Sequence, residues 1–94
     1  HPSLATAAYF LILHGIGALA MVALARAAEA PGIYVASAAV MVIGVMLFSG
    51  DLTARAMLGE RLFPMAAPIG GSLLIVAWLV GGVAGFAGAF MRRG

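Results

Sequence analysis

Residues 4–25 read LATAAYFLILHGIGALAMVALA and contain no Asp, Glu, Lys or Arg. Two further stretches, residues 30–50 and 62–91, are equally free of these charged residues. About 20 apolar residues of α-helix are enough to cross a hydrocarbon core that is about 30 Å thick. The three stretches therefore predict an all-α integral membrane protein that crosses the membrane three times.

The composition of the chain points to the same class. Hydrophobic residues make up 65% of the 94 residues and charged residues only 9%, against about 25% charged residues in soluble domains. A soluble domain of this size buries only about 60% of the surface of its unfolded chain, so it could not hide so much apolar surface. The chain has no cysteine, which excludes disulfides and thiol chemistry.

The connections between the stretches predict how the helices are arranged. Pro31 and Gly32 break the helix at the first connection. The second helix is therefore expected to return antiparallel to the first, giving an up-down-up bundle. Gly50 weakens the second helix, and Asp51 is a good cap for a new, short interfacial helix before the last span. Pro68 suits the first position of the last helix. A single transmembrane domain is predicted over residues 1–94, with spans at about 4–28, 31–50 and 68–91 and an interfacial segment at 51–63.

The five arginines supply all the positive charge and lie at the ends of the stretches. This placement is typical of membrane-interface residues and leaves no basic stripe for nucleic acid, which is excluded as a partner. With three spans, Arg26, Arg92 and Arg93 lie on one side and Arg55 and Arg61 on the other. The positive-inside rule then favours a cytoplasmic C-terminus.

Small residues recur every fourth position in the last stretch, at Ala77, Gly81, Gly85 and Ala89. In lipid, this spacing lets helix backbones approach closely. Two interpretations remain open. The small residues pack against the other two helices of the chain, or they dock the last helix onto another protein.

His14 lies near the centre of the first stretch, where polar groups are costly and are candidates for function. A neutral imidazole could hydrogen-bond to Ser37 or to a backbone carbonyl. It could instead relay a proton or ligate the metal of a haem or pigment, since a chlorophyll-type magnesium needs one axial ligand. Gly15 and Gly17 would leave room for a macrocycle. The cofactor candidates are therefore a tetrapyrrole pigment or a lipid.

The sequence contains no pattern for catalysis. It has no phosphate-binding loop, no dinucleotide-binding glycines, no zinc spacing and no Ser-His-Asp set. No catalytic residue and no metal site are predicted, and the protein is not expected to be an enzyme.

Two local runs resemble a known family. Phe48, Ser49 and Gly50 are followed about 20 residues later by Ala67-Pro68-Ile69-Gly70-Gly71 and then by Ala77-Trp78. This combination resembles the bacterial YgdD-like family, the domain-of-unknown-function family numbered 423, which is related to eukaryotic transmembrane protein 256. The motif residues of that family are matched here by Phe48, Ser49, Gly50, Pro68, Gly70, Gly71 and Trp78.

The resemblance implies a multi-pass protein of the bacterial inner membrane. Members typically have four spans, so the three spans here would correspond to the second, third and fourth, with the first missing. Such a four-span protein has both ends in the cytoplasm. The family has no established activity, so the resemblance implies no reaction.

These observations favour a small, non-catalytic accessory or structural subunit of a larger inner-membrane complex, photosynthetic or respiratory. Its expected partners are other membrane protein subunits and lipids. One alternative is a small oligomeric transporter or channel-like protein. A second alternative is a pigment-binding subunit that uses His14.

Overall fold

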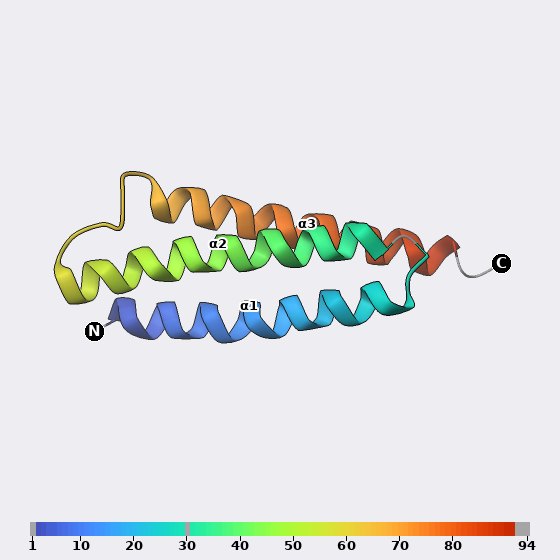
Figure 1. The fold of residues 1–94 in the computed structure, drawn as a ribbon, viewed down its shortest axis with the longest axis horizontal. Coiled ribbons are helices and arrows are strands. Elements are labelled where there is room, and N and C mark those ends of the chain that lie inside the picture. Colours follow the sequence, from blue (N-terminus) through green and yellow to red (C-terminus); the bar gives the residue numbers. More distant parts are fainter. Residues whose placement is uncertain (1, 30, 92–94) are drawn as a thin grey trace.

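The computed structural model describes residues 2–29 and 31–91. It contains three helices, α1 (Pro2–Ala27), α2 (Pro31–Leu58) and α3 (Ala66–Met91), and no strand within the described residues (Figure 1). All three helices are long and apolar enough to cross a membrane. The predicted all-α class with three spans is confirmed, and the chain is a small multi-pass membrane protein.

The three helices form an elongated bundle of 55 × 21 × 16 Å. α2 packs against both α1 and α3, and each helix runs antiparallel to the one before it (Figure 1). The predicted up-down-up order is therefore confirmed. Arg26 lies near the end of α1, at the end of the bundle opposite Arg55 and Arg61, whereas Arg92 and Arg93 lie outside the described residues.

The predicted break at Asp51 is wrong, because α2 continues without interruption to Leu58. A glycine inside a helix costs only about 1 kcal/mol, so Gly50 alone does not end it. Asp51 is fully buried in the last third of α2, and its carboxylate binds the Leu62 N–H beyond the end of the helix and Arg55 within it. Residues 51–58 therefore form the last turns of α2, and the predicted interfacial helix over 51–63 is not formed.

The end of α2 is fixed by Gly59, which adopts a positive φ of 74°. The Gly59 N–H donates to the Arg55 carbonyl at 3.1 Å. This is the left-handed cap with which many helices end, and glycine adopts it without steric cost. At the other end, Pro31 is the first residue of α2, where its missing N–H and fixed φ suit a helix start.

A tight turn leads into α3. Pro64 and Met65 occupy its centre, and the Ala66 N–H donates to the Phe63 carbonyl at 3.2 Å. Met65 has a φ of 71°, which the third residue of a type II turn requires and which glycine usually supplies. α3 therefore begins at Ala66, two residues before the predicted start. Pro68 lies in the first turn, where its missing N–H has no helical acceptor to lose.

The core is a narrow seam along α2. The buried apolar side chains include Met21 of α1, Tyr34, Met41 and Val45 of α2, and Leu74 of α3. Large apolar side chains also cover the outer faces of all three helices. In a membrane these outer faces contact lipid or another membrane protein, so the bundle needs no polar exterior.

Candidate functional site

Within the described residues, four polar or charged side chains are buried: His14, Ser37, Ser49 and Asp51. The first three lie in the apolar part of the bundle, and Asp51 lies beside the connection between α2 and α3. Buried polar groups in a membrane are costly unless they find partners, and they mark candidate sites. The partners of these four side chains decide what the bundle can do.

His14 connects α1 to α3. Its Nε2 accepts a hydrogen bond from Trp78 Nε1 at 3.0 Å, and its Nδ1 lies 2.8 Å from the carbonyl oxygen of Phe10. The indole N–H can only donate and the carbonyl can only accept. The imidazole is therefore neutral, with its proton on Nδ1, and both of its nitrogens are engaged.

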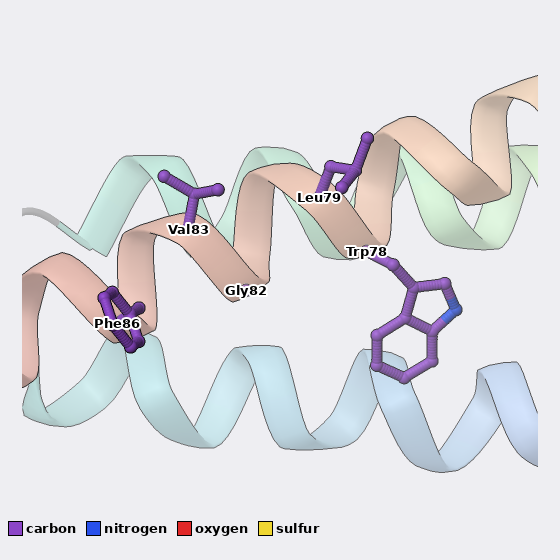
Figure 2. A pocket seen from close by; sticks show the side chains of 5 residues that line it. All are labelled: Trp78, Leu79, Gly82, Val83 and Phe86. Atoms are coloured by element: carbon purple, nitrogen blue, oxygen red, sulfur yellow. The ribbon is translucent and has the colours of Figure 1, made fainter.

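Aromatic rings surround this hydrogen bond. The Phe10 ring stacks on the imidazole with centroids 5.4 Å apart, and the Phe48 ring lies 4.5 Å from that of Phe10. The Trp78 ring meets the imidazole edge to face at 5.8 Å. Figure 2 shows the indole extending from α3 toward α1. Phe10, His14, Phe48 and Trp78 thus form one aromatic cluster with members from all three helices.

Gly17 makes the space that Trp78 occupies. A Cβ added to Gly17 would lie 2.9 Å from Met41 Sδ and 2.9 Å from Trp78 Cη2. The room that Gly17 was expected to leave for a macrocycle is therefore filled by side chains of α2 and α3. A metal bound to His14 Nε2 would also have to displace the Trp78 N–H, because that N–H occupies the nitrogen lone pair.

The two buried serines connect the remaining pairs of helices. Ser37 Oγ donates to the Ala77 carbonyl at 2.6 Å and joins α2 to α3. Ser49 Oγ donates to the Ala7 carbonyl at 3.0 Å and joins α1 to α2. Of the two alternative partners expected for His14, the structure shows the backbone carbonyl, that of Phe10, and Ser37 bonds to α3 instead. Each pair of helices is therefore joined by at least one side-chain hydrogen bond.

The closest approach of α2 and α3 is at Gly44 and Gly70. A Cβ added to Gly70 would lie 2.6 Å from the Phe48 nitrogen and 2.7 Å from the Gly44 carbonyl oxygen. These are backbone atoms, so only glycine fits at this crossing. Gly71 and Gly50 are less crowded, since an added Cβ would meet Phe48 and Leu62 at ordinary contact distances.

The small residues of α3 differ in how deeply they lie. Ala77 and Gly81 are buried, and a Cβ added to Gly81 would collide with Met21 and lie 3.0 Å from Ser37 Oγ. Gly85 is half-buried and Ala89 is exposed. The first two positions of the predicted series therefore face α1 and α2, and the series leaves the interface toward the end of α3.

Asp51 holds the connection between α2 and α3. Its Oδ1 accepts the backbone N–H of Leu62 at 2.8 Å, and its Oδ2 lies 2.9 Å from Arg55 Nε. The contact with Arg55 is an ion pair without hydrogen-bond geometry, because Oδ2 has no hydrogen-bond donor among the described residues. The carboxylate is fully buried and the Arg55 side chain is 40% exposed. The pair is therefore a buried carboxylate under a partly exposed arginine.

Two open, apolar grooves flank α3. One, of about 340 Å³, is lined by Trp78, Leu79, Gly82, Val83 and Phe86 (Figure 2). The other, of about 500 Å³, is lined by Ile33, Leu79, Val80, Val83, Ala84 and Ala87. Neither groove contains an ionisable side chain. Within residues 2–29 and 31–91, no group of three or more His, Cys, Asp or Glu side chains could hold a metal ion.

Sequence reasoning missed two of these features. The motif alone gives Trp78 no partner, although a tryptophan in the middle of a span needs an acceptor for its N–H, and the imidazole of His14 can supply one. The burial of Asp51 could not be foreseen, because it depends on the connection folding back over α2.

Comparison with known proteins identifies one family. The family model of a protein of unknown function, DUF423, matches residues 1–71. The matched range includes the motif residues from Phe48 to Gly71 and ends before Trp78. No curated protein and no solved structure matches the chain.

Proposed function

The chain belongs to DUF423, a family of proteins of unknown function, and on that premise we propose that it is a non-catalytic accessory subunit of a larger membrane complex. One observation carries the proposal. The buried polar side chains of the spans are used to join the helices to one another. Within the described residues, His14, Ser37 and Ser49 are thus engaged in contacts between helices and are not free to bind a substrate.

The outer surface supports the same proposal. The helix faces that are not used inside the bundle carry large apolar side chains, and two open grooves run beside α3. A small bundle with a fixed interior and an apolar exterior is suited to fill space beside larger membrane subunits. Association in lipid depends on packing of this kind, because lipid tails are as apolar as the side chains themselves.

The transporter alternative needs polar groups along a path, and the hydroxyls of the spans are already engaged. Ser37 is bonded across to α3, whereas Thr6 and Ser72 donate to carbonyls of their own helices and are exposed on the outer faces. His14 has both nitrogens occupied. These assignments favour the accessory subunit over a path through the bundle. A pigment-binding role would require His14 to release Trp78.

The bacterial inner membrane, the cytoplasmic C-terminus and a photosynthetic or respiratory host belong to the same proposal. The experiment is native gel electrophoresis of membranes solubilised in two mild detergents, with the chain followed by mass spectrometry. We expect it to co-migrate with larger subunits at the same ratio in both detergents. A chain that migrates alone, or only with copies of itself, in both detergents would contradict the proposal.

A further inference from the structure

The hydrogen bond between α1 and α3 exists only while His14 is neutral. We propose that His14 and Trp78 form a proton-sensitive latch, closed when the imidazole is neutral and opened when it takes up a proton. Opening releases the indole from α1 and changes the groove lined by Trp78, Leu79, Gly82, Val83 and Phe86. This inference is independent of the proposed accessory role.

The donor and acceptor pattern makes the bond conditional. Trp78 Nε1 carries a hydrogen and needs an acceptor, which the unprotonated Nε2 of His14 supplies at 3.0 Å. A proton added to the ring goes to Nε2, because Nδ1 already donates to the Phe10 carbonyl at 2.8 Å. Two N–H groups would then face each other, and the bond would be replaced by repulsion.

The position of Trp78 lets the latch open without unfolding the bundle. α1 and α3 each pack on α2, and the bonds of Ser37 and Ser49 to the backbone do not involve the imidazole. Trp78 itself is 40% exposed, so its indole has space on the outer side of the groove. The indole can therefore leave the space beside Gly17 while the three helices stay together.

The other ionisable side chains of the described helices lie away from the aromatic cluster, so His14 is the group that takes up the proton. α3 contains no Asp, Glu, His, Lys, Arg or Tyr between Ala66 and Met91. The ionisable side chains of α2 are Tyr34, Asp51 and Arg55, and only Phe48 of α2 enters the aromatic cluster. Asp51 lies roughly 13 Å from His14 along the bundle axis, as judged from the pairing of Ser49 with Ala7 and the rise of a helix.

On α1, Tyr9 is 72% exposed and contributes no ring to the cluster. The ring that stacks on the imidazole is Phe10, at 5.4 Å, and an aromatic face at this distance attracts a cation. The protonated ring thus keeps a favourable neighbour after Trp78 has left.

The chain contains a single tryptophan, so its tryptophan fluorescence arises from Trp78 alone. The full chain in vesicles containing brominated lipids is titrated from about pH 8 to about pH 5, the range of histidine titration. We expect quenching of Trp78 by the bromine atoms to increase as the pH falls and to reverse on return, while circular dichroism shows unchanged helix content.

Two variants separate His14 from other groups. His14→Gln keeps one acceptor and one donor but does not titrate, so its quenching should stay constant with pH. Asp51→Asn removes the buried carboxylate and should keep the wild-type response. A wild-type signal that does not change with pH would overturn the proposal, and so would an equal change in His14→Gln or a response lost only in Asp51→Asn.

A second measurement needs no variant and covers the case in which His14→Gln does not fold. The indole N–H of Trp78 gives one resonance in the NMR spectrum of the labelled chain in micelles. It should shift upfield at the same midpoint as the ring protons of His14. An indole resonance that stays fixed while His14 titrates would show that the two are not coupled.

Discussion

Replacing Gly70 with alanine tests the closest contact of the fold. The added Cβ would lie 2.6 Å from the Phe48 nitrogen and 2.7 Å from the Gly44 carbonyl oxygen. Ordinary contact begins at 3.4 Å, so α2 and α3 must separate locally by about 0.8 Å. Because the crowded atoms belong to the backbone, no side chain can rotate away to relieve the contact.

The energetic cost follows from this separation. Overpacking of a well-packed interface costs about 1–3 kcal/mol, and alanine regains up to about 1 kcal/mol through its higher helix propensity. After subtracting this gain in full, we expect Gly70→Ala to lower the free energy of unfolding by up to about 2 kcal/mol. The measurement is the unfolding midpoint in mixed micelles of mild detergent and sodium dodecyl sulfate, followed by circular dichroism.

Gly82 provides the matched control on the same helix. A Cβ added there has nothing within 4 Å. Gly82→Ala should therefore leave stability unchanged or raise it by up to about 1 kcal/mol. If Gly70→Ala and Gly82→Ala unfold at the same midpoint, the close approach at Gly70 does not exist in the membrane protein and the reasoning fails.

Three further predictions use the same preparation. Ser37→Ala should lower the free energy of unfolding by about 0.5–1 kcal/mol, because the hydroxyl loses its bond across to α3. Ser72→Ala, whose hydroxyl bonds within its own helix, should be neutral in the same assay. Equal effects of the two variants would argue against the interhelical bond. Asp51→Ala should speed trypsin cleavage after Arg61, because the Leu62 N–H of the connection loses its carboxylate acceptor. Asp51→Asn should be cut more slowly than Asp51→Ala, because its amide oxygen still accepts this hydrogen bond. Equal cleavage rates of the two variants, measured by mass spectrometry, would refute this. Met65→Gly should raise stability by about 0.5–1 kcal/mol, because glycine adopts the positive φ of this turn without strain, and a lower unfolding midpoint would count against that turn.

The residues on which the resemblance was based have different physical roles in the structure. Ser49 provides a hydrogen bond to α1, and Gly70 allows the backbone of α3 to meet that of α2. Phe48 packs in the aromatic cluster, and Trp78 completes it. The residues that make the resemblance recognisable are thus largely those that hold the three helices in contact.

The prediction at Asp51 failed for a reason that is general to short connections. A Gly-Asp pair in a sequence favours a helix end, since aspartate caps helices well and glycine weakens them. Here the backbone N–H of Leu62 and the Arg55 side chain satisfy the carboxylate within a continuous helix. Arg55 lies one turn further along α2, whereas Leu62 follows the end of the helix, so the local sequence does not reveal the bond to the Leu62 N–H.

The number of spans was determined by the sequence alone. A hydrocarbon environment requires each backbone polar group to be satisfied inside the chain, so long uncharged segments must become helices of about membrane length. Pro31 likewise determines where α2 begins through a local effect, because its fixed φ and missing N–H suit the first position of a helix. The choice of partners was decided only by the tertiary structure. Whether His14 meets Ser37 or Trp78 depends on the rotation of each helix about its axis, and that rotation is set by close contacts such as Gly17 against the indole and Gly70 against α2. Nearly uniform apolar helices carry little amphipathic pattern that would fix this rotation in advance, so packing and a few buried hydrogen bonds decide it.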